Sequence, residues 1–188
     1  MKIEILSGSA RENSTTKRVA LHLQDWFQKN THHEIGLINL QEWHLPPVQS
    51  AYSSPDKAPN EYRPLAERIF AADAFVIVSP EYNGSYSPAL KNLLDHFPKQ
   101  HHKVFGIATS SPGAMGGLRA SQQLLQLVPA LFAVASPYLL IIPQVDKKFS
   151  EEGKLVDESF TNSIHTFTHE FLWLAEKLVK STETISFN

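Results

Sequence analysis

Short apolar runs alternate with helix-length amphipathic segments along the chain, and this alternation restricts the fold more than any other feature of the sequence. The apolar runs predict strands over 2–7, 33–39, 74–78, 103–108 and 138–142. Apolar residues at helical spacing predict helices over 14–29, 61–71, 88–97, 118–134 and 159–180. Alternating strands and helices form a parallel sheet with helices on both faces.

The number of strands favours one order of the sheet. Five strands fit a doubly wound, flavodoxin-like order 2-1-3-4-5 better than the six-stranded dinucleotide fold, so we expect a single α/β domain over residues 1–188. Three polar turns follow predicted strands: the first turn (8–14), the second turn (80–86) and the third turn (109–117). Ligands bind at the carboxyl ends of the strands in such sheets, and we expect the three turns to meet there.

Composition excludes several classes of function. The chain has 188 residues, a net charge of −2 and no cysteine. The charge gives no reason to expect nucleic-acid or membrane binding, and the lack of cysteine excludes disulfides, cysteine-ligated iron–sulfur clusters and thiol chemistry. No secretory signal opens the chain, and the apolar segment 124–145 contains three prolines, so we expect a buried helix and strand there, not a membrane span. These features suit a cytoplasmic protein.

The first turn carries a signal for anion binding. The first turn and the start of the helix after it combine a guanidinium, the amides of a helix N-terminus and four hydroxyls, which belong to Ser9, Ser14, Thr15 and Thr16. These groups suit a phosphate dianion. The turn is neither a Walker A loop nor a G-x-G-x-x-G fingerprint, so a nucleoside triphosphate or a conventionally bound dinucleotide is disfavoured.

The charges near this turn support the same interpretation. Helix N-termini prefer acidic residues, yet Arg11, Lys17 and Arg18 stand here against Glu12 alone. A bound anion would explain this reversed preference. The alternative is that Ser14 or the neighbouring asparagine merely caps the helix while the basic residues face water, and the turn alone does not choose between the two.

The other two turns offer backbone more than reactive side chains. Asn83, Gly84, Gly113, Gly116 and Gly117 allow close approach to a flat ligand. Two tyrosines, Tyr82 and Tyr86, suit an aromatic ring; alternatively these are plain turns in which the tyrosines fill gaps. A phosphate pocket beside two backbone walls indicates a phosphorylated planar cofactor, for which flavin mononucleotide (FMN) is the natural candidate.

Three motifs resemble the NADPH-dependent FMN reductase family, which includes quinone, chromate and azo-dye reductases. They are Gly8-Ser9-x-Arg11-x-x-Ser14, Pro80-Glu81-Tyr82-Asn83-Gly84-Ser85 and Leu90-Lys91-Asn92-x-x-Asp95. The third turn with Arg119, and then Phe149-x-x-x-Gly153-x-Leu155, follow in the expected order. The resemblance therefore spans nearly the whole chain.

The resemblance implies that FMN binds where the three turns meet. Its phosphate would be held by Ser9, Arg11, Ser14, Thr15 and Thr16. The ribityl chain and ring edge would lie along Pro80, Glu81, Tyr82, Asn83 and Gly84, and the other side of the ring would be closed by Ser110, Ser111, Gly113 and Gly116. The chain departs from the family at His96, where tryptophan is common, which would alter the pocket rim or an oligomer contact, and at Thr16, where asparagine is frequent.

The resemblance further implies an FMN-dependent NAD(P)H oxidoreductase. Hydride would pass from NADPH or NADH to the flavin, and then electrons to quinones or similar small acceptors in a ping-pong cycle. The flavin carries this chemistry, so we nominate no catalytic side chain. A homodimer or homotetramer is expected from the family. Two alternatives remain: a flavodoxin-like electron carrier between protein partners, which a charge of −2 fits poorly, and a nucleotide-sensing module without turnover.

Other residues suggest weaker hypotheses. Two histidine pairs, His32-His33 and His101-His102, are adjacent in sequence and seldom bind one ion, so we expect no metal. His165 and His169, one helical turn apart, are more simply explained as solvated or interface residues. No G-x-S-x-G motif supports a hydrolase. We expect the 43–60 loop to border the pocket or a neighbouring subunit, and the two-sided apolar helix at 118–134 to form a subunit interface.

Overall fold

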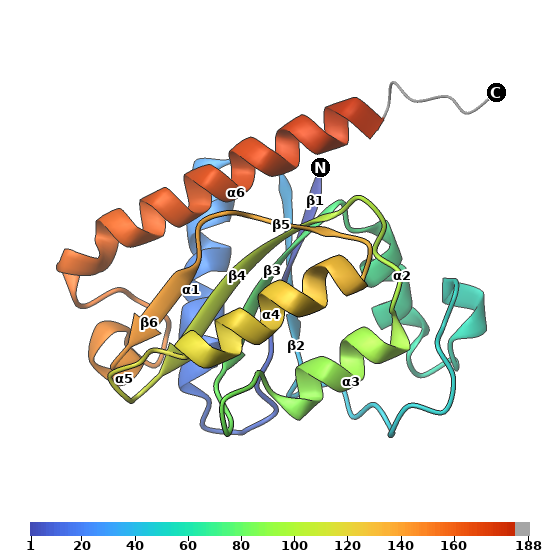
Figure 1. Cartoon of the computed structure of the whole chain (residues 1–188), viewed down its shortest axis with the longest axis horizontal. Helices are drawn as coiled ribbons and strands as arrows, with labels where there is room; N and C mark the ends of the chain where they lie inside the picture. The colour runs from blue at the N-terminus through green and yellow to red at the C-terminus, as the bar shows by residue number, and fades with distance from the viewer. Residues whose placement is uncertain (183–188) are drawn as a thin grey trace.

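The computed structural model describes residues 1–182 and shows a parallel sheet between two layers of helices (Figure 1). The strands are β1 (Lys2–Ser7), β2 (Glu34–Asn39), β3 (Ala74–Pro80), β4 (Val104–Ser111), β5 (Val134–Ala135) and β6 (Leu140–Pro143). Their order is β2-β1-β3-β4-β5, and β6 also pairs with β4. This order confirms the predicted flavodoxin-like α/β fold.

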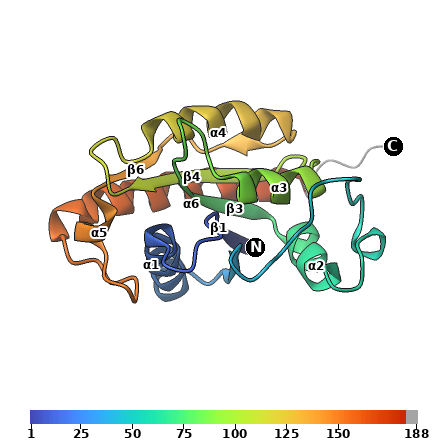
Figure 2. The same cartoon turned by 90° about the horizontal axis from the view of Figure 1, so that it is seen from below.

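Helices cover both faces of the sheet (Figure 2). One face carries α2 (Arg63–Ala71), α3 (Pro88–His96) and α4 (Leu118–Ala130), and the other carries α1 (Thr15–Asn30) and α6 (Thr161–Thr182). Because side chains alternate along a strand, β3 sends Phe75 and Ile77 into the first core and Val76 and Val78 into the second. All four are buried, which explains why β3 is a continuous apolar run.

A glycine in β4 sets how closely α6 packs on the sheet. A Cβ atom at Gly106 would lie 3.0 Å from Phe171 Cδ2 and 3.1 Å from Phe167 Cζ. Both phenylalanines are fully buried. The missing side chain therefore makes room for the two rings through which the closing helix covers β4.

The segment from the end of α4 to the last strand differs from the prediction. The predicted helix 118–134 ends at Ala130, and Val134 already belongs to β5. Pro129 lies in the last turn of α4, and Phe132 has a φ of 61°, which takes the chain out of the helix. After β5 the chain stops pairing with β4 near Pro137, and it pairs with β4 again as β6. Two short strands therefore lie beside β4, where a single strand was predicted at 138–142.

The loop at 43–60 packs against α3. Tyr52 is buried, and its ring contacts His96 and Phe97 at centroid distances of 5.0 and 5.5 Å. The Asn92 amide donates hydrogen bonds to the carbonyls of Leu45 and Pro46, at 3.1 and 3.0 Å. His96, the departure from the family pattern, is thus a buried support for this loop.

Three short helices complete the fold. They are η1 (Pro55–Lys57), α5 (Val145–Lys148) and η2 (Glu158–Phe160). The first lies within the 43–60 loop, and α5 follows shortly after β6. Within residues 1–182, no helix is both long and apolar enough to cross a membrane.

Candidate functional site

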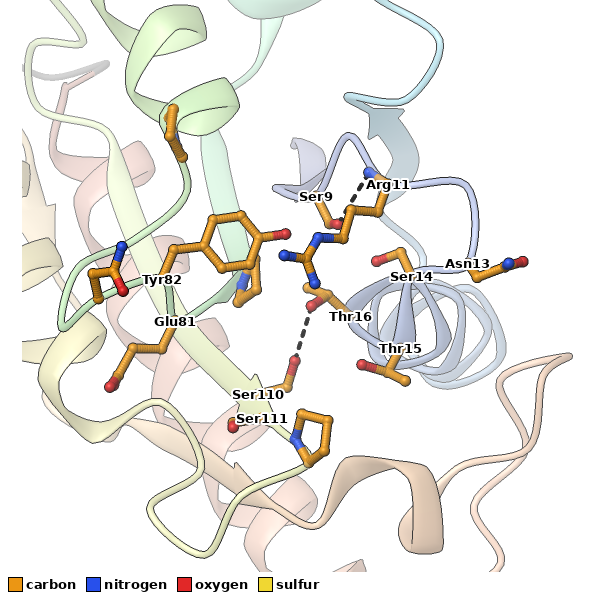
Figure 3. Close-up of a pocket in the computed structure, with 14 residues that line it drawn as sticks. Ser9, Arg11, Asn13, Ser14, Thr15, Thr16, Glu81, Tyr82, Ser110 and Ser111 are labelled. Carbon is orange, nitrogen blue, oxygen red and sulfur yellow. Dashed lines mark hydrogen bonds between the residues drawn. The ribbon is translucent and has the colours of Figure 1, made fainter.

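The three turns surround a polar cavity of about 670 Å³, here called the edge cavity (Figure 3). Its lining residues are Ser9, Arg11, Asn13, Ser14, Thr15, Thr16, Pro80, Glu81, Tyr82, Asn83, Pro88, Ser110, Ser111 and Pro112. The sequence named all of them as cofactor residues except Asn13, Pro88 and Pro112. Asn13 and Pro112 are next to predicted site residues in the sequence, and Pro88 begins α3. Three named glycines, Gly84, Gly113 and Gly116, lie outside this lining.

The first turn delivers a helix N-terminus to the cavity. Ser14 is the N-cap of α1, and its hydroxyl accepts a hydrogen bond from the Lys17 amide at 3.2 Å. Ser9 is buried, and its hydroxyl accepts from the Arg11 amide at 3.3 Å. Ser14 therefore caps the helix and also lines the cavity, so the capping and binding interpretations are compatible. The positive end of α1 faces the cavity with basic neighbours.

Ser87 holds the first turn against α3. Its hydroxyl donates to the Gly8 carbonyl and accepts from the Leu90 amide at 3.1 Å, and Ser87 is buried. The Gly8 amide donates to the Val78 carbonyl at 2.8 Å, which ties the same turn to the end of β3. Sequence reasoning missed Ser87, although a serine just before Pro88 is a typical helix cap.

Arg11 spans the space between the first and second turns. Its guanidinium carbon lies 4.5 Å from the centroid of the Tyr82 ring, and Figure 3 shows the two side chains pointing toward one another. A cation over an aromatic face is attracted by the ring quadrupole. The contact places a positive charge at the edge cavity, where an anion would meet it.

A buried hydrogen bond joins the first helix to the third turn. The Ser110 hydroxyl donates to Thr16 Oγ1 at 3.2 Å, and both residues are only 2% exposed. Thr16 lies at the start of α1, whereas Ser110 lies near the end of β4. Two of the predicted site residues, 94 positions apart in the sequence, are thus adjacent in space, and both line the edge cavity.

The second turn is a tight hairpin. The Tyr82 amide donates to the Ser85 carbonyl at 2.8 Å, and the Ser85 amide donates back at 3.1 Å. Asn83 and Gly84 between them have φ values of 51° and 84°. Positive φ at both central positions is the requirement of a type I′ turn, for which Asn-Gly is the preferred pair. The Asn-Gly dipeptide therefore fixes the shape of this wall.

Glu81 connects the second turn to α4. Its Oε2 accepts hydrogen bonds from the Arg119 amide at 3.0 Å and the Ala120 amide at 3.2 Å. In Figure 3 its side chain extends away from the first turn. Tyr86, the other tyrosine suggested as a ring contact, is partly buried against the core beneath α2, α3 and α4, and this burial raises its pKa.

The edge cavity fits a phosphorylated planar group. One end offers hydroxyls, a guanidinium and a helix N-terminus, which suit a phosphate. The other walls are the hairpin of the second turn and the third turn at the end of β4. In the described part of the chain, no three His, Asp or Glu side chains gather closely enough to hold a metal ion. Fold and cavity together define an α/β protein with a cavity at the carboxyl edge of its sheet, where the first turn offers groups that suit an anion.

Comparisons with known proteins identify the family. Residues 1–146 match the model of the NADPH-dependent FMN reductase family. The chain is 31% identical over 180 residues to the FMN-dependent NADPH-azoreductase of Staphylococcus aureus (strain USA300), covering 92% of this chain and 94% of that protein. The chain therefore belongs to the NADPH-dependent FMN reductase family, which confirms the predicted family and, with it, FMN and NAD(P)H as cofactor and co-substrate.

Solved structures share the fold. FerB, a flavoenzyme NAD(P)H:(acceptor) oxidoreductase from Paracoccus denitrificans, matches with a TM-score of 0.74 at 22% identity, covering 94% of this chain and 97% of that chain. The FMN-dependent NADH-azoreductase from Bacillus anthracis str. Ames Ancestor, in complex with FMN, matches with a TM-score of 0.55 at 15% identity, covering 93% and 99%. These likenesses extend over nearly the whole chain.

Proposed function

We propose that this single-domain protein passes electrons from NADPH or NADH to quinones, azo compounds or similar small acceptors in a ping-pong cycle, with FMN in the edge cavity. The observation that carries the proposal is that motif residues from three distant turns line one cavity. That cavity combines the N-terminus of α1, which suits an anion, with a tight hairpin on another wall. The azoreductase relative supports azo compounds as one class of acceptor.

Each wall has a distinct task in this proposal. The phosphate would be held by Ser9, Arg11, Ser14, Thr15 and Thr16. Pro80, Glu81, Tyr82 and Asn83 would form one side of the flavin site, and Ser110 and Ser111 the other. The named glycines, which lie outside the cavity lining, would act by setting the backbone of the turns. When bound, FMN supplies the hydride-accepting and electron-donating chemistry, and the protein binds and orients it.

A visible spectrum of the purified protein tests the proposal. We expect FMN to copurify or to bind on addition, its yellow colour to bleach with NADPH, and the colour to return when a quinone or an azo dye is added. Initial rates at several acceptor concentrations should give parallel double-reciprocal lines if the two substrates take turns. A protein that binds no FMN would contradict the proposal at its first step.

The same experiment separates the alternatives. A flavodoxin-like electron carrier between protein partners would bind FMN but remain oxidised with both NADPH and NADH. A nucleotide-sensing module would bind FMN without measurable reductase turnover. Steady NAD(P)H oxidation that depends on the acceptor would exclude both of these functions.

We also propose that the protein acts in the cytoplasm as a homodimer or homotetramer. Leu118 at the start of α4 and Phe132 and Val134 after its end are 40%, 58% and 40% exposed, so this helix presents apolar side chains at both ends. Sedimentation equilibrium measures the subunit number. A Phe132→Ser variant should weaken the assembly if this surface is the interface, and a monomer at all concentrations would contradict the proposal.

A further inference from the structure

Helix α4 begins without a capping side chain of its own. Its N-cap is Gly117, which has a φ of 87°, and its first turn is Leu118-Arg119-Ala120-Ser121. A Cβ atom at Gly117 would lie 2.7 Å from Thr109 Cβ, so a serine or aspartate cap cannot replace the glycine without a shift in the backbone. The first amides of a helix need acceptors. In α4 they must therefore find one outside the helix.

Glu81 supplies that acceptor from the second turn. Its Oε2 binds both the Arg119 and the Ala120 amide, and its side chain is only 15% exposed. A carboxylate at the positive end of a helix is stabilised by the helix dipole, and amide bonds to a charged acceptor are stronger than neutral ones. The Arg119 guanidinium lies 4.0 Å from Oε1 but is 73% exposed, so it adds little to the contact. The backbone amides carry the interaction.

This contact joins the second and third turns, which form two walls of the edge cavity. The sheet itself joins these turns only where β3 pairs with β4. Pro80 pairs with Ser110 in the register of β3 and β4, and beyond this pair the two chains separate into the second and third turns. In the second turn, Glu81 directly precedes Tyr82, which contacts Arg11. Gly117 ends the third turn. The Glu81 carboxylate thus connects the second turn to the end of the third turn, beyond the strand pairing.

We propose that Glu81 is a positioning residue whose carboxylate fixes the start of α4, and with it the third turn, to the second turn, and so sets the separation of two cavity walls. The side chain acts on the cofactor through these walls. That FMN occupies the cavity rests on the proposed function, whereas the tie between the turns does not.

Amide exchange in the FMN-free protein tests the tie directly. We expect a Glu81→Ala variant to exchange the Arg119 and Ala120 amides faster than the wild type, and also the Tyr82 and Ser85 amides of the hairpin, because the tie holds both turns. Equal exchange in the two proteins would overturn the proposal. If the wild type binds no FMN, the proposed function fails, and this measurement still decides whether the tie exists.

Cofactor affinity tests whether the tie positions the walls. The loss of a charged acceptor for two amides should raise the FMN dissociation constant of Glu81→Ala by about tenfold. Glu81→Gln keeps one oxygen acceptor but loses the charge, so its FMN dissociation constant should lie between those of the wild type and Glu81→Ala. Arg119→Ala keeps the backbone amide and serves as the matched control, with affinity within about twofold of the wild type. An unchanged affinity in Glu81→Ala would overturn the positioning role.

A double variant separates positioning from simple capping. Glu81→Ala/Arg119→Glu places a carboxylate on the first turn of α4 itself, which restores a favourable charge at the helix end but not the link to the second turn. We expect the thermal midpoint to recover toward the wild type while the FMN dissociation constant stays raised. Recovery of both quantities together would show that capping alone explains Glu81 and would overturn the proposal.

Discussion

The guanidinium of Arg11 lies over the ring of Tyr82, with 4.5 Å between the guanidinium carbon and the ring centroid. The two residues come from different turns, and each also lines the edge cavity. A long, flexible side chain that is already held beside the cavity loses less conformational entropy when it meets an anion. We therefore expect the aromatic ring of Tyr82 to assist anion binding through Arg11.

A Tyr82→Leu substitution should weaken FMN binding by about two- to fivefold, because an exposed cation–π contact contributes about 0.5–1 kcal/mol and its loss frees the arginine. Quenching of flavin fluorescence during a titration measures the affinity. Tyr82→Phe keeps the aromatic face and should remain within about twofold of the wild type. Equal weakening in both variants would instead indicate a role for the phenol hydroxyl.

An Arg11→Ala substitution should weaken FMN binding by about 10- to 100-fold, since hydrogen bonds to charged groups contribute about 1.5–3 kcal/mol. Riboflavin lacks the phosphate, so its affinity should be the same in the variant and the wild type. Parallel titrations with the two flavins measure this difference. A similar loss for riboflavin would contradict the assignment of Arg11 to the phosphate.

A Gly117→Ala substitution should destabilise the protein by about 1–3 kcal/mol, because the residue has a φ of 87° and its new Cβ would meet Thr109 Cβ at 2.7 Å. Thermal or urea unfolding of the FMN-free protein measures the loss. Gly113→Ala is the matched control in the same turn, since its Cβ would meet only the Ser111 hydroxyl, at 3.3 Å. Equal stability in both variants would contradict the strain argument.

Acidification should destabilise the fold through His96. This side chain is buried, and burial lowers its pKa below 6.5, partly offset by the negative charge of Asp95. Below the unfolded pKa the unfolded chain binds a proton that the folded chain resists, so the free energy of unfolding falls as the pH drops. The loss ends once the pH is below the folded pKa.

Comparison with a His96→Gln variant isolates this contribution. Glutamine does not titrate, so the variant should lose less stability than the wild type as the pH falls through about 6.5 toward the lowered folded pKa of His96. His22, whose pKa is also lowered by burial, titrates in both proteins and cancels in the difference. Urea unfolding at several pH values measures the free energies. Parallel pH profiles would contradict a role for His96.

Much of the fold was predictable from local patterns. The strand at 74–78 is a continuous buried run, and α1 shows apolar residues at helical spacing, so periodicity alone placed both. The motifs at the first and second turns named most of the cavity lining, because short sequence motifs that begin where strands end share one edge of a parallel sheet. That these residues bind FMN stays a prediction.

Other features depend on contacts that local sequence does not contain. The apolar residues of α4 continue past Ala130, so the end of the helix and the split of the last strand around Pro137 were not visible in the pattern. The bond from Glu81 to the Arg119 amide joins residues 38 positions apart and arises from the register of β3 and β4. The role of His96 under the 43–60 loop likewise depends on tertiary packing.

The division of the last strand into β5 and β6 affects how copies of this protein can meet. Strand β4 pairs with Val134–Ala135 of β5 and, from Leu140 on, with β6. Opposite Gly106 and Ile107, between these two strands, the pairing is interrupted. An interrupted edge strand of this kind is a poor template for another chain, because strand addition needs a continuous row of free amides and carbonyls. We therefore expect no strand of another molecule to add along this edge of the sheet.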